Sequence, residues 1–190
     1  MNLDASLDDA QALRRLIDEQ QIRDALCRYA RGVDRGDWDL VRTAYHPDAF
    51  DEHGDYKGDI DGFIAWLDQR FAGLDNSMHF LGQTLIEFAG PDVALVETYF
   101  VSRRLNPAKP GDAAGAGAGA GDALAREAWG RYVDRFERRG GAWKVAHRTV
   151  VLEALSTALA IGGQRVLARR WGRRDHGDRL YEVEREIFGA

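Results

Sequence analysis

Three residues that could exchange protons with a substrate lie in two short segments of the chain. Tyr29 and Asp34 are five positions apart in CRYARGVD, near the end of a helical pattern, and His79 follows in NSMHFLGQ, where a strand pattern begins. An aspartate that faces a histidine fixes the tautomer of the ring and stabilises the imidazolium that forms when the histidine accepts a proton. No metal or nucleophile motif accompanies them, so they predict an acid/base pair that folding brings together. A helix cap and ordinary core packing are the competing interpretations.

The elements that would position these residues begin with three helices. Apolar residues at helical spacing between Leu13 and Tyr29 predict a long first helix that ends near Gly32 or Gly36. Asp37 can cap a short helix, WDLVRTAY, which Pro47 stops, and Asp59 can cap a third helix, IDGFIAWLDQRFAGL. Between these two helices the residues 48–53 alternate, which puts Asp51 and His53 on one face of a short strand.

Beyond the third helix the apolar pattern changes to a period of two. Strands are predicted over 79–88 and 93–105, and over 124–138 and 143–155, as two antiparallel pairs. The expected fold class is α+β, with helices packed as a cone on a curved, mainly antiparallel sheet that encloses a pocket. We expect one domain over 1–155, interrupted by a mobile Gly/Ala-rich insertion at 106–122, and a C-terminal helical extension over 156–190. The insertion is either a cover over the pocket or only a hairpin tip.

Composition excludes several classes of function. The 26 Lys and Arg residues against 31 Asp and Glu give a net charge of 26 − 31 = −5, so we expect no nucleic-acid partner and no anionic membrane partner. The single Cys27 excludes an internal disulfide, and its apolar neighbours predict a buried position. The first residues are acidic, and no window reaches the roughly 18 apolar residues of a membrane helix, so a cytoplasmic protein is expected.

The order of these elements and several short sequence segments resemble the SnoaL-like branch of the nuclear-transport-factor-2-like superfamily. The similar segments are RYARGVDRGDWDLVRTAYHPDA, DEHGDYKG, SMHFLG, ALVETYF and ERRGGAWKVAHR, which lie in order between about residues 10 and 155. Scytalone dehydratase, a bile acid dehydratase and hexachlorocyclohexane dehydrochlorinase belong to this branch. The resemblance implies a pocket in which an aspartate of the first helix region serves a histidine of the sheet, without a metal or other cofactor.

The resemblance assigns roles to five residues of this chain. Asp34 and His79 occupy the places of the catalytic pair, and Tyr29 and Arg148 match further catalytic residues of the bile acid enzyme. His53 stands where that enzyme carries a tyrosine, so its role as a substrate-orienting residue departs from the pattern. Of the alternating residues His147 and Arg148, only one can point into the pocket, and the resemblance favours Arg148.

Further polar and aromatic residues have two interpretations each. Glu97, Tyr99 and Trp129 could project from the strands and bind substrate, or they could be ordinary strand residues. The histidines and carboxylates at positions 46, 48, 51 and 53 have types that bind metals, but Pro47 and the short strand scatter them. We therefore expect no metal site.

The sequence thus predicts a cofactor-independent lyase that acts on a small hydrophobic, aromatic or cyclic, hydroxylated compound. Dehydration is the simplest reaction, and loss of formaldehyde from a diol side chain by a retro-aldol step is another. A non-enzymatic binding or assembly module of the same fold is the alternative, followed by an isomerase or an epoxide hydrolase. A homo-oligomer is expected, because the apolar residues of the C-terminal extension are suited to packing across subunits. The resemblance implies a trimer slightly ahead of a dimer.

Overall fold

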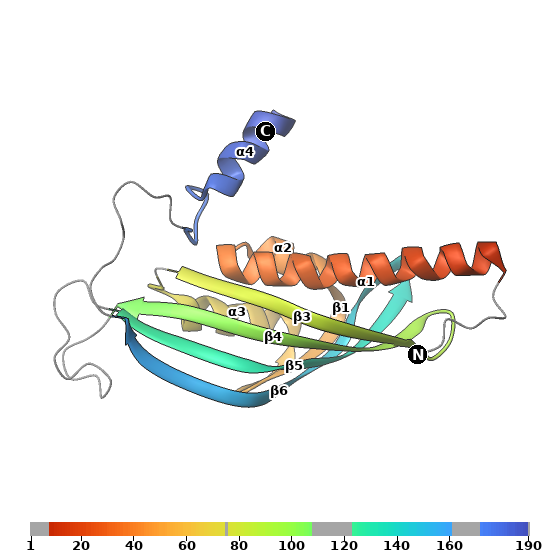
Figure 1. Cartoon of the computed structure of the whole chain (residues 1–190), viewed down its shortest axis with the longest axis horizontal. Helices are drawn as coiled ribbons and strands as arrows, with labels where there is room; N and C mark the ends of the chain where they lie inside the picture. The colour runs from red at the N-terminus through yellow and green to blue at the C-terminus, as the bar shows by residue number, and fades with distance from the viewer. Residues whose placement is uncertain (1–7, 75, 108–122, 161–171, 190) are drawn as a thin grey trace.

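The computed structural model describes residues 8–74, 76–107, 123–160 and 172–189. A curved sheet of six strands carries helices on its concave side, and the C-terminal helix lies farther out, beyond the long first helix (Figure 1). The helices are α1 (Asp9–Arg35), α2 (Trp38–Thr43), α3 (Ile60–Phe71) and α4 (Arg179–Phe188). The strands are β1 (Tyr45–His53), β2 (Tyr56–Asp59), β3 (Asn76–Phe88), β4 (Val93–Pro107), β5 (Ala123–Arg139) and β6 (Ala142–Ala160).

The sheet order is β2-β1-β6-β5-β4-β3, in which β1 and β6 run parallel and every other neighbouring pair runs antiparallel. This α+β architecture confirms the expected fold class. Gly90 lies in the turn of the β3–β4 hairpin, and Gly140 and Gly141 lie in the turn of the β5–β6 hairpin, where all three take positive φ values that other residues rarely adopt. Pro47 does not stop α2, which ends at Thr43, but lies in β1 where the pairing with β6 is irregular.

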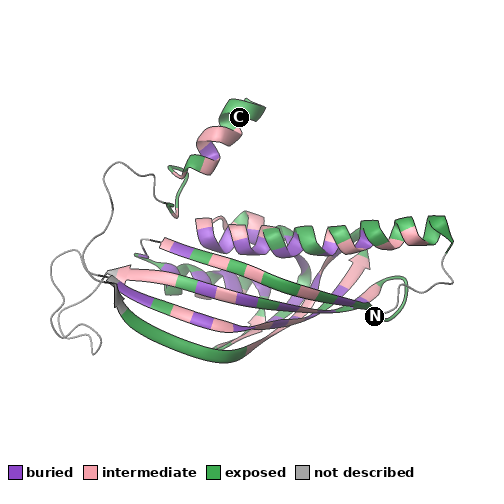
Figure 2. Cartoon of the chain, in the orientation of Figure 1, coloured by how far each residue is buried: buried purple, intermediate pink, exposed green. Residues whose placement is uncertain are grey.

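Helix α1 begins and ends at side chains and backbone that suit those positions. The Asp8 side chain accepts a hydrogen bond from the backbone of Gln11, and Gly36 ends the helix with a φ of 69°. The helix therefore continues past Gly32, where the sequence allowed an earlier end. Figure 2 shows buried residues on the side of α1 that faces the sheet. This side includes Tyr29 and Asp34, so the helix delivers both residues to the concave face.

The remaining expectations for the fold concern the long strands, the position of Cys27 and the segments beyond the core. The four long strands exist, and β6 continues five residues beyond the expected end at 155. Cys27 is exposed, so its predicted buried position is wrong. Most of the 106–122 insertion lies outside the described residues, as do residues 161–171 between β6 and α4. Within the described part of the chain, no helix combines the length and apolar character that a membrane crossing requires.

One glycine sets how closely two strands approach beneath the concave face. A Cβ atom on Gly130 would lie 2.4 Å from the backbone oxygen of Val151 and 3.0 Å from the ring of Phe100. The ring of Phe100 stacks on Tyr132, with 4.3 Å between centroids. The absence of a side chain at Gly130 therefore leaves room for this aromatic stack.

We expect Gly130→Ala to lower the free energy of unfolding by about 1–3 kcal/mol, because a backbone oxygen cannot move aside for the added methyl group. Urea unfolding followed by circular dichroism measures this change. Gly82→Ala is the matched control, since the nearest atoms to its added Cβ are at 3.5 Å. Equal stability of the two variants would contradict the interpretation of Gly130.

Candidate active site

Asp34 and His79 form a close pair between the end of α1 and the start of β3. The Nδ1 atom of His79 lies 2.7 Å from Oδ1 of Asp34, and the backbone N–H of His79 donates to Oδ2 at 2.7 Å. The hydroxyl of Ser77 donates to Oδ1 at 2.9 Å. Because both oxygens of Asp34 accept hydrogen bonds from β3, the carboxylate is fixed relative to the histidine ring.

The surroundings of Asp34 favour its ionised form. Burial alone would raise the pKa of Asp34, but the hydrogen bonds and charge of His79, together with the hydroxyl of Ser77, lower the pKa below its ordinary value. An ionised Asp34 accepts the proton on Nδ1 and so leaves Nε2 of His79 unprotonated in the neutral ring. The pair thus has the arrangement of a general base with an orienting carboxylate.

His79 lines a pocket of about 210 Å³ between the sheet and α3. The rings of Phe100 and Tyr132, which stack nearly parallel at 11°, form part of its wall. The other lining residues are His53, Gly54, Asp55, Arg70, Phe71, Ser102, Arg104, Ala128, Val150, Leu152 and Leu155. A mostly apolar wall with a few polar groups is typical of small-molecule sites.

A second histidine with a carboxylate lines the same pocket. Nδ1 of His53 lies 3.4 Å from Oδ1 of Asp51, and both atoms are buried without a hydrogen bond to another group in the described part of the chain. Oδ2 of Asp51 accepts a hydrogen bond from the hydroxyl of Tyr45 at 2.7 Å. The alternation predicted for β1 is therefore confirmed, since Asp51 and His53 point to one side.

Arg148 points inward, as the sequence favours, but it does not line the pocket. Its guanidinium binds both carboxylate oxygens of Asp134, at 2.8 and 2.6 Å, and donates to the hydroxyl of Tyr45 at 3.2 Å. It is completely buried between the rings of Tyr29 and Tyr132, 4.3 and 4.1 Å from their centroids. Burial alone would lower the pKa of Arg148, but the charge of Asp134 raises it, so the guanidinium stays charged.

Tyr29 likewise lies behind the pocket wall. Its ring meets the ring of His79 edge to face, with 6.4 Å between centroids, and burial raises the pKa of its hydroxyl. Neither Tyr29 nor Arg148 lines the pocket, so their expected direct contact with substrate is not supported. Both instead hold the surroundings of His79 and Tyr132 in place.

Three residues expected to bind substrate lie on the opposite face of the sheet. In β4 the buried residues are Val96, Thr98 and Phe100, and the alternate residues Glu97 and Tyr99 face outward. Trp129 pairs with Val101 on the same outer face. The expectation that Glu97, Tyr99 and Trp129 enter the pocket is therefore wrong, because the strand phase fixed by the buried residues turns them away.

Asp134 and Ser77 are two important residues that the sequence reasoning missed. Asp134 lies between Tyr132 and Phe136 at a spacing of two, so the strand period alone would have put it on the inner face. Ser77 precedes His79 by two residues and shares its face for the same reason. The partner that each residue binds comes from a distant segment and has no local sequence signal.

The histidines and carboxylates around Pro47 point to different neighbours. His46 contacts the backbone oxygen of Glu137 at 2.9 Å, and Asp48 pairs with Arg139 at 2.5 Å. Asp51 and His53 contact each other, as described above. Within the described residues, no three metal-ligating side chains converge.

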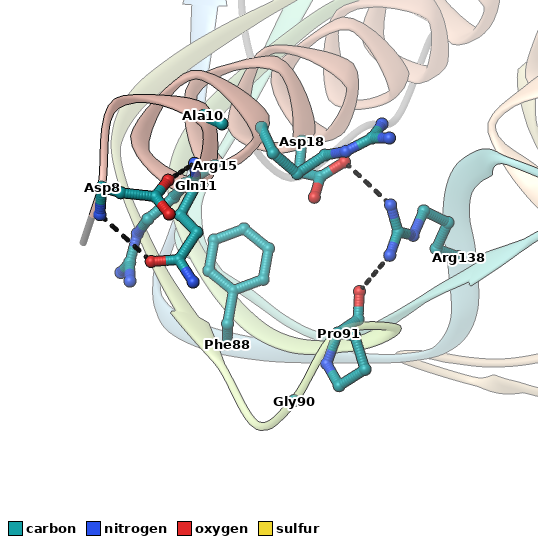
Figure 3. Close-up of a pocket in the computed structure, with 10 residues that line it drawn as sticks. Asp8, Ala10, Gln11, Arg15, Asp18, Phe88, Gly90, Pro91 and Arg138 are labelled. Atoms are coloured by element: carbon teal, nitrogen blue, oxygen red, sulfur yellow. Dashed lines mark hydrogen bonds and ion pairs between the residues drawn. The ribbon is translucent and has the colours of Figure 1, made fainter.

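A larger hollow, of about 400 Å³, lies at the other end of the molecule (Figure 3). Phe88 points into it, and Arg138 bridges Asp18 and the backbone oxygen of Pro91 across it. Its lining contains no histidine, cysteine or hydroxyl side chain. The hollow therefore lacks the proton-transfer groups that the smaller pocket contains.

Comparisons with known proteins agree with this architecture. A sequence model of the SnoaL-like domain matches residues 14–149. No curated protein sequence matches the chain.

Three solved structures are similar to this chain. A candidate scytalone dehydratase from Novosphingobium aromaticivorans has a TM-score of 0.64 and 13% identity over 76% of this chain and 90% of its own. The hexachlorocyclohexane dehydrochlorinase LinA-type3 from Novosphingobium barchaimii has a TM-score of 0.63 and 17% identity over 77% and 93%. A candidate aromatic ring hydroxylase from Novosphingobium aromaticivorans has a TM-score of 0.63 and 21% identity over 75% and 94%. At these identities the likeness shows the fold.

The buried pair of Arg148 and Asp134 generates a stability prediction. Arg148→Met should lower the free energy of unfolding by about 3–5 kcal/mol, because it leaves the carboxylate of Asp134 buried without a partner. The double variant Arg148→Met/Asp134→Leu should recover most of this loss, since no buried charge remains. Urea unfolding of the single and double variants measures both effects.

Arg131→Met is the control for that experiment, because Arg131 pairs with Glu97 and Glu153 on the outer face and should matter little. A double variant as unstable as the sum of its single variants would contradict the interpretation of the buried pair.

The lowered pKa of Asp34 generates a prediction about acid stability. A carboxyl group with a lower pKa in the folded chain contributes stability that is present above about pH 4, its ordinary pKa, and is lost as the pH falls through the lowered value. Asp34→Asn removes this contribution, so its free energy of unfolding should fall less steeply with acidification than that of the wild type. Urea unfolding between neutral and acid pH measures the two slopes, and parallel curves would contradict the prediction.

Proposed function

This chain belongs to the SnoaL-like domain family, and we propose that it is a cofactor-independent lyase for a small hydrophobic, aromatic or cyclic, hydroxylated compound. The observation that carries the proposal is the contact of 2.7 Å between Nδ1 of His79 and the buried carboxylate of Asp34. This contact leaves the other ring nitrogen of His79 for a substrate in the pocket. The fold neighbours named as a dehydrochlorinase and a candidate dehydratase are consistent with elimination chemistry.

In the proposed reaction, Nε2 of His79 removes a proton from a carbon of the substrate. The electron pair of the broken C–H bond forms a C=C bond, and the C–O bond to the neighbouring hydroxyl group breaks. The hydroxyl leaves as water after it takes up a proton, either from the imidazolium of His79 or from a protonated His53, in which case His79 releases its proton to solvent afterwards. Asp34 stabilises the imidazolium that exists between these proton transfers. No electron carrier is needed, because the substrate is neither oxidised nor reduced overall.

His53 is placed to assist the departing hydroxyl group. It lines the same pocket as His79, and the carboxylate of Asp51 lies 3.4 Å from its ring. An imidazole beside a carboxylate can hold a proton and donate it to the oxygen that leaves. The separate positions of His79 and His53 let one ring remove a proton while the other supplies one.

The pocket also supports the proposed class of substrate. Its volume of about 210 Å³ is below the range of roughly 300–1,000 Å³ that drug-sized ligands occupy, so a small compound fits it. The stacked rings of Phe100 and Tyr132 offer a flat apolar wall to an aromatic or cyclic compound. The retro-aldol loss of formaldehyde uses the same base to remove a hydroxyl proton and remains the second reaction to test.

The expected homo-oligomer stays a prediction. Apolar side chains on the outer face of the sheet, including Met78 at 54% and Phe80 at 66% exposure, support contact with a second copy of the chain. Light scattering of the purified protein measures the mass, and a monomer at working concentration would contradict this expectation.

The proposal predicts that His79→Gln and Asp34→Asn each lower turnover by about 100-fold or more, since a positioned acid/base group typically contributes that much. Mass spectrometry of hydroxylated aromatic and cyclic compounds, incubated with the wild type and each variant, would detect products that have lost water or formaldehyde. The double variant should be no slower than the worse single variant, because the two residues act as one unit.

His147→Gln is the matched control and should keep full turnover, because His147 faces outward and contacts Glu52 at 3.2 Å. Full activity of either pair variant would contradict the mechanism, and a bound compound that always leaves unchanged would favour a binding module instead. Chelation should leave turnover intact, whereas a loss that one specific ion restores would overturn the cofactor-free proposal.

A further inference from the structure

Four arginines gather around one end of the pocket that contains His79. Arg70 and Arg104 line the pocket, and Arg126 is the direct cross-strand neighbour of Arg104 in the β4–β5 register. Arg174, from the segment that precedes α4, lies over the ring of Phe71 at 4.8 Å. Arg104 lies over the same ring at 5.3 Å. The chain has a net charge of −5, so this local excess of positive charge does not follow from composition.

The charge of Arg104 has no carboxylate partner among the residues that the structure describes. Within the described part of the chain, no hydrogen bond or ion pair joins Arg104 to an acidic side chain. Burial and the charges of Arg70, Arg126 and Arg174 lower its pKa to about 10. The sole acidic contact of Arg70 in that part is Asp55 at 3.9 Å, and the Asp55 side chain is 89% exposed.

The neighbouring Arg103 shows what a structural arginine of this strand looks like. It faces outward and pairs with Glu127 at 3.2 Å. Its cross-strand position therefore carries opposite charges, whereas the position of Arg104 and Arg126 carries like charges, which destabilise a sheet. A destabilising arrangement of this kind, such as two like charges opposite each other, is expected at functional sites.

The register of the sheet places this positive end beside the acid/base pair. Ser77, which donates to Asp34, is the cross-strand partner of Arg104, and His79 is the partner of Ser102. Two residues along a strand span about 7 Å. The cross-strand pair of Arg104 and Ser77 is thus about 7 Å from the pair of Ser102 and His79 on the same face, a distance that one aromatic ring can span.

We propose that Arg104, supported by Arg70 and Arg126, binds a carboxylate group of the substrate and holds its reacting carbon against His79. This inference rests on the proposed function, and it narrows the substrate to a small aromatic or cyclic acid. A guanidinium matches a planar carboxylate with two parallel hydrogen bonds, which fixes orientation as well as position. The bound carboxylate compensates the charge of Arg104, which has no acidic partner among the described residues.

Benzoate is a suitable probe, because it combines the flat ring and the carboxylate without a group that can react. Isothermal titration calorimetry should show saturable binding to the wild type, and Arg104→Gln should weaken it about tenfold or more. Arg104→Lys should give an intermediate loss, since it keeps the charge and removes the two-pronged geometry. Arg103→Gln is the matched control and should bind benzoate as the wild type does.

Benzamide, which has the same shape without the charge, should bind the wild type about tenfold more weakly than benzoate. Arg104→Gln should lose this preference. Four results would each overturn the proposal: no saturable binding of benzoate, equal binding of benzoate and benzamide, unchanged binding by Arg104→Gln, or displacement of benzoate by an equal concentration of sulfate. Circular dichroism of each variant verifies its fold before the titration.

The same titration separates this proposal from the lyase proposal. Benzoate binding requires no turnover, so His79→Gln should still bind benzoate and prefer it to benzamide. Binding that survives in His79→Gln and fails in Arg104→Gln supports the anion site even if the acid/base mechanism proves wrong. Loss of benzoate binding in His79→Gln that equals the loss in Arg104→Gln would overturn the assignment to Arg104.

Discussion

The carboxylate of Asp34 joins the end of the long helix to the first long strand of the sheet, and the arrangement of the pocket depends on it. Its two oxygens accept hydrogen bonds from the backbone and ring of His79 and from Ser77. Removing the carboxylate would leave buried donors on β3 without a partner, which costs more than a hydrogen bond gains. The contact that fixes helix to sheet is therefore also the contact that orients the proposed base.

A second buried charge governs the layer beneath the pocket. The guanidinium of Arg148 is completely buried, and Asp134 accepts two hydrogen bonds from it that favour its charged form. Through the hydroxyl of Tyr45 it connects to Asp51, which faces His53. Two histidines of the pocket are thus supported by carboxylates from two separate buried networks, which meet at the rings of Tyr29 and Tyr132.

The sequence predicted much of this because some signals are local and others are not. Helix caps and the change of apolar period after the third helix depend on neighbouring residues, so the order of elements could be predicted. The pair of Asp34 and His79 came from the resemblance, since nothing in its spacing requires the contact. Glu97, Tyr99 and Trp129 were misplaced because the phase of a strand decides which face a residue takes, and a shift of one residue reverses it. The partnership of Arg148 and Asp134 depends on register, which distant segments set together.

The base His79 and the arginines Arg104 and Arg70 line the same pocket for one physical reason. A neutral base that takes a proton from carbon leaves negative charge on the substrate, and fixed positive charge nearby lowers the energy of that state. Arg104 and Arg70 line the pocket that His79 lines, and their charges have few acidic partners in the described part of the chain. A carboxylate on the substrate would neutralise part of the positive charge of these arginines. It would also fix the distance between the remaining positive charge and the reacting carbon. Arg104 and Arg70, which have few acidic partners among the described residues, are thus the residues that can both orient an acidic substrate and stabilise the charge that its reaction creates.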